Sequence, residues 1–552
     1  MSKRWMKLGV GALAAAGAGF LVVTAWYVVR AAPVGTGFTA KYLCSSYFIA
    51  GQDPRSAFSE DVAPVNPLAG LVRWRIDRRQ MTATADILGF FKATALYRQG
   101  CGCTLLAGAS EAELRRQTFF RMPPAAGPVA GRGMLPWPRG RGAAEDPASL
   151  GVDREMLAAA LDRAFTEPGA QGQSRRTRAV VVVYRGHVIA ERYAAGFKAD
   201  MPFPGWSMAK SVTNAMVGVL VRHGLLHIDA PAPVPRWRQP DDPRGRITLD
   251  HLLRMSSGLE FEEIYTPLRD AARMLYTTTD FAAYAADKPL AARPGDRWHY
   301  SSGPANIVAG IVRRAAEKQT RPYYGFFYRE LFHRIGMQSV VLEPDPSGTF
   351  AGSSYIWATA RDWARFGLLY LRDGVWDGRR ILPDGWVAYT VTPAPAAPRG
   401  EYGALFWLNA GPAADPSRRL WPHAPRDTFA AQGFRDQKLF IIPSRALILV
   451  RFGATSGRSA WSSDEFIADI LAALPADEPG SPKGPRRNNF RYYPSRLQAI
   501  FVRSEGAKSS KELAIPPVLR PQIGRRWPEA GMDKSGNYFF ASPKYASMPP
   551  PA

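Results

Sequence analysis

The hydrophobic pattern of the chain begins with one long apolar stretch. Residues 8–29 contain no charged side chain, and Lys3, Arg4 and Lys7 precede them. Read as a helix at about 1.5 Å per residue, this stretch spans about 33 Å, which is enough to cross the hydrocarbon core of a bilayer. The basic residues on its N-terminal side predict a cytoplasmic N-terminus, with the rest of the chain outside.

A cleaved signal peptide is the alternative interpretation of this stretch, and the protein would then be secreted. However, the apolar run is longer than the usual hydrophobic region of a signal peptide. The sequence Arg30-Ala31-Ala32-Pro33 is also a poor match to a small-x-small cleavage site. We therefore favour a retained transmembrane helix that anchors the chain in the inner membrane.

The middle of the chain carries two other patterns, one typical of strands and one of helices. Residues 179–184 and 188–193 are β-rich apolar runs on either side of Arg185-Gly186, which predicts a hairpin. Apolar side chains recur at helical spacing over residues 207–221 and 362–371. Residues 439–442 and 446–452 predict two further strands. Strands at both ends with helices between them predict an α+β fold, in which an antiparallel sheet is covered by helices.

Composition shifts divide the chain into five regions. Residues 1–33 form the anchor or signal, 34–119 a small β-rich lead-in, and 120–149 a linker rich in Pro, Gly and Arg. A dense globular pattern fills residues 150–474. Residues 475–552 form a basic, Pro-rich C-terminal extension, for which we expect a partly extended or disordered conformation.

The charge and cysteine content narrow the functional classes. The 71 basic and 47 acidic side chains give a formal net charge of +24. This charge is spread along the chain without a zinc-finger, RNP or P-loop pattern, so we interpret it as surface charge and expect no nucleic-acid partner. In an oxidising compartment, Cys44 can pair with either Cys101 or Cys103, which leaves one free thiol. We expect no metal site, because the seven histidines lack ligand spacing.

The first candidate for chemistry is Ser207, with Lys210 three residues later. On a helix, positions i and i+3 share a face, so the Lys amine can lie against the Ser hydroxyl. A serine is a weak nucleophile until a base removes its proton, and a lysine serves if burial lowers its pKa. By itself this spacing arises easily by chance, and its plain interpretation is a capping serine beside a surface lysine.

Two later segments strengthen the hypothesis. Tyr300 follows a turn signal, and its phenol could relay protons beside the Ser–Lys pair. Ala431-Gln432-Gly433-Phe434 leads into the predicted strand pair, where a glycine permits close backbone approach. The backbone N–H groups of Ser207 and Phe434 could then form an oxyanion hole. The plain alternatives are a core tyrosine and an ordinary β-turn.

With these segments in order, the chain resembles the serine β-lactamase and penicillin-binding-protein superfamily. The likeness is to the class C-like branch, which also holds esterases and 6-aminohexanoate-dimer hydrolase, and covers roughly residues 150–474. It rests on residues 206–211, 224–231, 247–259, 294–303 and 358–367 and on Gly433. Each segment is weak alone, whereas their common order is specific. Cys44 and residues 102–104 also resemble the lead-in of exported relatives.

The resemblance implies a fold and a set of roles. The fold would be β-lactamase/transpeptidase-like, with a helical subdomain beside the sheet. Ser207 would be the acylated nucleophile, Lys210 its proton acceptor, and Tyr300 the partner base and proton donor to the leaving group. The expected substrate contacts are Ser302, Gln432, Gly433 and Tyr265. No cofactor is required, and the catalytic domain would lie in the bacterial periplasm.

Departures from the family pattern shape the expected substrate. Ser302 stands where many relatives carry Asn, which fits the esterase and amidase side of the family. The third motif keeps Gly433 but has Ala431 where relatives that act on β-lactams carry Lys or His. A substrate carboxylate would lose its ion-pair partner there, unless Arg435 compensates. We therefore expect a small amide or ester substrate.

Two other interpretations remain open at this stage. A non-catalytic relative that binds the cell wall would explain the altered third motif, although the intact Ser207, Lys210 and Tyr300 argue against it. A true β-lactamase or D,D-peptidase is the other. The acidic segment at residues 260–263, together with Tyr265, either lines the cleft or forms a solvated loop.

Overall fold

The computed structural model describes residues 3–117, 137–140, 142–319, 323–412, 415–457 and 459–476. The predicted linker lies partly, and the C-terminal extension almost wholly, outside these residues. The centre of the fold is a six-stranded antiparallel sheet in the order β12-β13-β14-β15-β5-β6. Its strands are β12 (Trp407–Leu408), β13 (Phe429–Gly433), β14 (Gln437–Ile442), β15 (Leu447–Gly453), β5 (Thr177–Tyr184) and β6 (His187–Tyr193).

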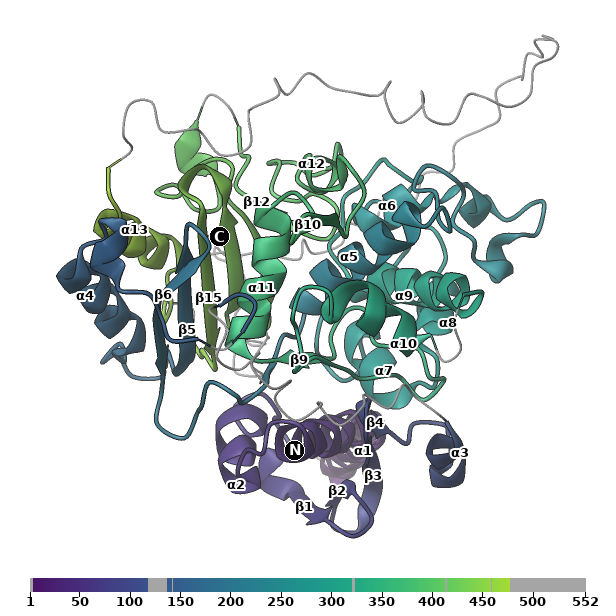
Figure 1. Cartoon of the computed structure of the whole chain (residues 1–552). Helices are drawn as coiled ribbons and strands as arrows, with labels where there is room; N and C mark the ends of the chain where they lie inside the picture. The colour runs from purple at the N-terminus through teal and green to yellow at the C-terminus, as the bar shows by residue number, and fades with distance from the viewer. Residues whose placement is uncertain are drawn as a thin grey trace, which may run out of the picture. The chain divides into compact units, whose positions relative to one another are not determined.

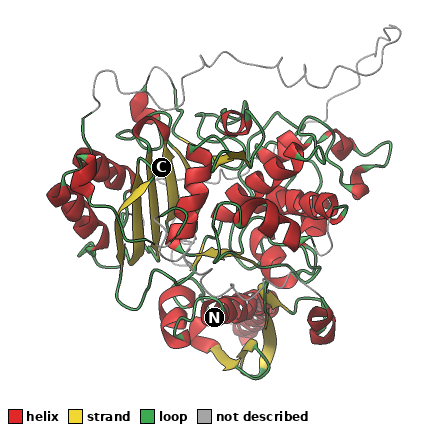
Figure 2. Cartoon of the chain, viewed as in Figure 1, coloured by secondary structure: helices red, strands yellow, loops and turns green. Residues whose placement is uncertain are grey.

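Helices cover both faces of this sheet (Figures 1 and 2). Helix α11 (Ala360–Leu371) packs on β14, β15 and β5, while α4 (Arg154–Phe165) packs on β5 and against α13 (Ser463–Ala473). Strand β5 is buried along its whole length. Its run of valines suits a strand covered on both faces, because β-branched side chains pack well on a pleated surface.

A helical region stands beside the sheet and carries much of the candidate site. Helix α9 (Ser302–Glu317) packs against α5 (Met208–Arg222), α6 (Leu249–Leu253) and α8 (Phe281–Ala286). The remaining helices are α7 (Asp270–Thr277), α10 (Tyr324–Phe327) and α12 (Trp386–Thr390). A small sheet in the order β7-β9-β8 and a two-stranded sheet complete the region; their strands are β7 (Phe203–Pro204), β8 (Val341–Leu342), β9 (Ile356–Ala358), β10 (Val375–Trp376) and β11 (Arg379–Arg380).

The N-terminal part of the chain contains a four-stranded antiparallel sheet packed on one long helix. Helix α1 (Lys3–Phe48) contacts β2, β3 and β4 of this sheet as well as α7. The other elements are α2 (Pro54–Ala57), β1 (Val72–Asp77), β2 (Thr82–Ile87), β3 (Phe90–Arg98), β4 (Gly102–Leu105) and α3 (Glu111–Arg116). A disulfide joins Cys44 of α1 to Cys103 of β4, and Cys101 is a buried free thiol. The structure thereby settles which cysteine pairs with Cys44.

Sequence and structure agree on the main elements, with one difference. The hairpin over 179–193, the helices after Ser207 and near 362, and the C-terminal strand pair are all present, so the α+β fold with an antiparallel sheet and flanking helices is confirmed. However, α1 does not end near Pro33. The predicted β-rich lead-in begins with the second half of this helix, which is mostly buried from Ala31 to Ser46. Packing against the sheet outweighs the helix-breaking tendency of one proline.

Candidate active site

Ser207 stands immediately before helix α5, half-buried at the helix N-terminus. The preceding Gly205 packs so closely on the ring of Trp363 that a Cβ atom would lie 2.4 Å from it. Gly205 also donates a backbone hydrogen bond to Ile356 of β9, at 2.8 Å. A glycine is therefore required at this position, and the contact sets how the chain enters α5.

Lys210 lies one helical turn after Ser207, as the spacing predicted. Its side chain is 1% exposed, and its Nζ atom donates to Ser207 Oγ and to Ser302 Oγ, each at 3.2 Å, and to the carbonyl of Ser353 at 3.4 Å. Burial lowers the pKa of Lys210 to about 8, while the carboxylate of Glu263 opposes this shift. The amine is therefore neutral in a useful fraction of molecules near neutral pH, which suits a proton acceptor.

Tyr300 reaches the same point from a distant part of the sequence. It lies just before α9, and its hydroxyl hydrogen-bonds to the side chain of Ser207. The Lys210 amine sits 4.8 Å from the centre of its ring. Burial and the negative charge of Glu263 raise the pKa of Tyr300 well above its usual value. The phenol therefore stays protonated at neutral pH and is suited to donating a proton rather than accepting one.

A buried carboxylate, Glu263, organises the back of the site. Its two oxygens accept hydrogen bonds from the backbone N–H and the hydroxyl of Ser302, both at 2.7 Å, and from Tyr265 Oη at 2.9 Å. Ser302 is the first residue of α9, so the carboxylate also meets the positive end of a helix. These partners offset the cost of burying the charge and connect it to Lys210 through the hydroxyl of Ser302.

Sequence reasoning did not single out Glu263 from its acidic neighbours. The sequence signal was the apolar Phe261 two positions before Glu263. In the structure both residues are buried, whereas Glu262 between them is partly exposed. Two-residue alternation marks one face of an extended segment. Tyr265, predicted as a substrate contact, directs its hydroxyl to Glu263 and Ser302, so it belongs to this network.

The third motif lies at the end of β13 and meets the start of α5. A Cβ atom on Gly433 would lie 2.2 Å from the carbonyl oxygen of Gly205, so only glycine allows this approach. The rings of Trp206 and Phe434 then meet edge to face at 5.7 Å. The two segments predicted to supply the oxyanion hole, at Ser207 and Phe434, are thus neighbours, as that hypothesis requires.

Gln432 and Arg435, on either side of Gly433-Phe434, both have partners within the protein. Arg435 does not take the place of the missing cation, because its side chain is only 6% exposed and its Nη1 atom donates to Asp61 Oδ1 at 3.2 Å. The suggestion that it compensates is therefore wrong. Gln432 is mostly buried, and its Oε1 atom accepts from Lys438 Nζ on the adjacent strand at 2.6 Å. Its contact with substrate remains a prediction.

The part of the chain that holds the candidate site is similar to a known protein family and to several known proteins. The family model described as Beta-lactamase matches residues 161–472. The 6-aminohexanoate-dimer hydrolase of Paenarthrobacter ureafaciens is 24% identical over 299 residues, which are 50% of this chain and 72% of that protein. A penicillin-binding protein homolog from Caulobacter crescentus has a TM-score of 0.44 at 16% identity, covering 59% of this chain and 99% of its own. The hydrolase EstCE1, described as having promiscuous acyltransferase activity, has a TM-score of 0.46 at 16% identity, covering 59% and 98%.

Proposed function

Because the chain belongs to the beta-lactamase family, we propose that it is a serine hydrolase that cleaves an amide or ester through an acyl-enzyme on Ser207. The observation that carries this proposal is the meeting of three side chains. Ser207 Oγ lies 3.2 Å from Lys210 Nζ and also hydrogen-bonds to Tyr300, which is far away in the sequence. A hydroxyl between a buried amine and a protonated phenol has both an acceptor and a donor of protons at hand.

In the acylation step, Ser207 Oγ attacks the substrate carbonyl carbon while Lys210 Nζ takes the hydroxyl proton. The carbonyl oxygen becomes an oxyanion, which the N–H groups of Ser207 and Phe434 would stabilise. Tyr300 gives its proton to the leaving nitrogen or oxygen as the carbonyl–leaving group bond breaks, and regains a proton from the ammonium of Lys210. The net transfer is one proton from Ser207 to the leaving group.

Hydrolysis of the acyl-enzyme reverses these roles. A water molecule gives a proton to Lys210 and attacks the acyl carbon, and Ser207 Oγ leaves and recovers its proton. All of these transfers use side chains of this protein, so the proposal needs no metal or organic cofactor. The named relative that acts on the 6-aminohexanoate dimer supports a short linear amide as the substrate class.

We extend the proposal to the location of the enzyme. Among the described residues, one helix, α1, is both long enough and apolar enough to cross a membrane. Its exposed side chains include Phe20 at 71% and Val22 at 68%, and Trp26 stacks under Arg30 at 4.3 Å, a pairing that suits the bilayer surface. In this proposal, residues 8–29 anchor the chain and the catalytic region lies outside the cytoplasm.

A fluorophosphonate probe tests the chemistry directly, because an activated serine attacks its phosphorus, releases fluoride and becomes phosphonylated. We expect labelling of the wild-type protein, none of Ser207→Ala, and nearly none of Lys210→Ala. Ser149→Ala and Lys198→Ala, which change exposed residues, should be labelled like the wild type. An unlabelled wild type, or equal labelling of Ser207→Ala, would refute the proposal and favour a non-catalytic binding protein.

A further inference from the structure

Two residues next to the candidate oxyanion hole have strained backbones. Trp206, which precedes Ser207, has φ +47°, and Arg435, which follows Phe434, has φ +60°. Non-glycine residues adopt this left-handed region rarely, because it brings the Cβ atom too close to the backbone. Surrounding contacts must therefore hold both residues in place. Several of those contacts come from the N-terminal block, which we define as residues 31–105, and Arg435 also donates to the carbonyls of Ala454 and Thr455 after β15.

The first contact is aromatic and holds Trp206. Tyr42 of α1 stacks on the Trp206 ring with centroids 5.8 Å apart and planes 3° from parallel. Phe38, one helical turn earlier, lies 6.5 Å from the same ring. Phe434 meets Trp206 edge to face. The ring that sets the direction of Ser207 is thus packed between α1 and the loop after β13.

The second contact is ionic and holds Arg435. Besides its bond to Asp61, Arg435 Nη1 donates to the carbonyl of Glu60 at 2.8 Å. Asp61 is 5% exposed and also accepts from Arg178 Nη2 of β5 at 3.0 Å. One buried carboxylate of the N-terminal block thereby ties the loop after β13 to the central sheet. Tyr42, Asp61, Trp206, Phe434 and Arg435 all line a single small hollow.

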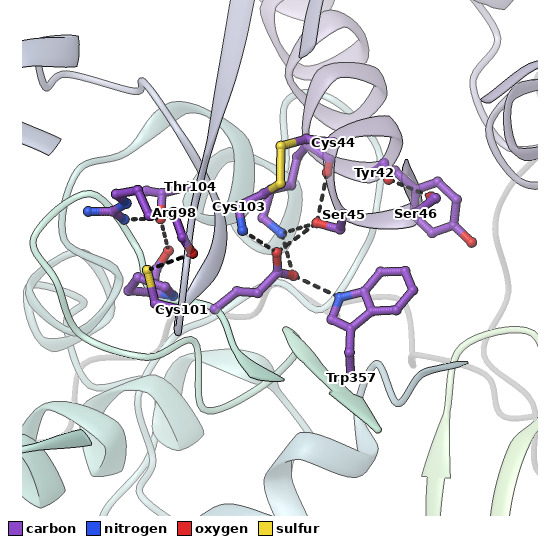
Figure 3. Close-up of a disulfide and its surroundings, with 12 residues drawn as sticks. Tyr42, Cys44, Ser45, Ser46, Arg98, Cys101, Cys103, Thr104 and Trp357 are labelled. Atoms are coloured by element: carbon purple, nitrogen blue, oxygen red, sulfur yellow. Dashed lines mark hydrogen bonds and ion pairs between the residues drawn. A yellow bond between two sulfur atoms is a disulfide. The ribbon is translucent and has the colours of Figure 1, made fainter. Parts of the chain in front are cut away.

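The N-terminal block is itself firmly attached to the rest of the enzyme (Figure 3). The fully buried carboxylate of Glu343 accepts from Lys41 Nζ at 2.6 Å, from Ser45 Oγ at 2.7 Å, and from the backbone N–H of Cys103 at 2.7 Å. The Cys44–Cys103 disulfide joins the two elements that supply these donors. Trp357 Nε1 completes the cluster at 2.8 Å. These contacts fix α1 relative to β9, which also holds Gly205.

All of these N-terminal residues precede residue 161, where the family match begins. We propose that the N-terminal block is a working part of the active site, with Asp61 and Tyr42 as positioning residues. They hold Arg435 and Trp206 so that the N–H groups of Phe434 and Ser207 converge on the developing oxyanion. This inference rests on the proposed function, since it assigns these residues to the same acyl-transfer site.

A purely stabilising role for the block predicts a different behaviour. In that case, loss of Asp61 would lower the melting temperature but leave the folded enzyme as active as before. A positioning role predicts a loss in the chemical step, because displacing a reacting group or oxyanion donor costs rate even when substrate still binds. Measuring kcat and KM separately therefore distinguishes the two roles, because only a positioning role lowers kcat while KM stays the same.

The test compares Asp61→Asn with Asp362→Asn in the full-length protein. Asp362 is also buried and pairs with an arginine, Arg365, at 2.7 Å. However, it contacts neither the segment around Ser207 nor the loop after β13. For Asp61→Asn we expect kcat on a nitrophenyl ester to fall at least about tenfold with KM nearly unchanged. Binding of an alkyl boronic acid, which forms a tetrahedral adduct on the serine, should weaken by a similar factor. Asp362→Asn should keep kcat and boronate binding near wild-type values.

A double-mutant cycle makes the test specific to the proposed contact. If Asp61 acts through Arg435, Asp61→Asn should have little further effect on kcat in an Arg435→Met background. Asp61→Glu, which keeps the charge, should recover part of the lost rate, and the melting curve of Asp61→Asn shows whether that variant is folded. Full additivity with Arg435→Met, or a kcat for Asp61→Asn equal to that of Asp362→Asn, would overturn the inference while labelling of Ser207 still stood. An unlabelled wild type would refute the proposed function and this inference together.

Discussion

Replacing Glu263 by glutamine should shift the pH dependence of acylation toward acid. In the proposed mechanism, the neutral amine of Lys210 accepts the proton of Ser207, so activity is lost as the pH falls through the pKa of Lys210. Burial lowers that pKa to about 8, and the carboxylate of Glu263 works in the opposite direction. Glutamine removes the charge that stabilises the ammonium form. The pKa of Lys210 then falls further, and activity persists to lower pH.

The geometry sets the size of this shift. Hydrogen bonds of 3.2 and 2.7 Å link Lys210 Nζ to Ser302 Oγ and Ser302 Oγ to the carboxylate, so the two charges lie no more than about 6 Å apart. At an effective dielectric constant of about 20, charges at this distance interact by about 2.8 kcal/mol, which corresponds to about 2 pH units. Because the network relaxes around the new amide, we expect a shift of about 1 to 2 units.

The assay is the rate at which a fluorophosphonate probe phosphonylates Ser207, which depends on the same base, followed from about pH 5 to pH 10. The wild-type rate should rise with a midpoint near pH 8, the value to which burial brings Lys210. The midpoint is the informative quantity, because damage to the site lowers the plateau without moving it. Glu262→Gln is the matched control, since that carboxylate pairs with Arg269 instead. A midpoint that stays in place or rises in Glu263→Gln would refute the assignment of Lys210 as the base.

Four further outcomes are expected. Tyr300→Phe should slow hydrolysis of an amide more than that of a matched nitrophenyl ester, whose leaving group needs no proton; equal losses in kcat/KM would contradict its role as donor. Cys44 and Cys103 are 59 positions apart, and replacing both by serine should lower the free energy of unfolding, measured in urea, by up to about 4 kcal/mol. The full-length protein should resist alkaline carbonate extraction with residues 8–29 present in its intact mass, whereas a mass that lacks them would reveal a cleaved signal. Nitrocefin should turn over far more slowly than a nitrophenyl ester, and comparable rates would show that the missing cation at Ala431 does not matter.

The elements that sequence predicted correctly are those with strong local patterns. The valine-rich run of β5 and the apolar spacing of α5 and α11 each specify an element, because one period of side chains is buried. The Ser–Lys contact also followed from local spacing. Tyr300 needed more than this, since no local rule places it beside Ser207. The order of several motifs supplied that information.

Contacts between distant residues were not predictable in this way. Lys41 and Glu343 are 302 residues apart, and neither lies in a pattern that points to the other. The buried half of α1 was also hidden, because Pro33 and the end of the apolar run both suggest that the helix stops near that point. Only the packing of this half on α7 and the N-terminal sheet extends the helix to Phe48. The active-site role of the N-terminal block therefore had no signal in the sequence.

The surroundings of Tyr300 and the third motif together favour an uncharged group on the substrate. Trp407 and Tyr402 pack on Tyr300, with ring centroids 5.1 and 5.7 Å away. Ala431, at the position where relatives that act on β-lactams carry a cation, is fully buried. Lys438, the cation on the adjacent strand, is 2% exposed and directed to Gln432 and Asp436. A carboxylate placed beside these buried rings would lose hydration, and without a nearby cation it would gain no ion pair in exchange. A neutral amide or ester does not meet this penalty, so we expect linear, uncharged acyl substrates to react faster than β-lactams, which carry a carboxylate.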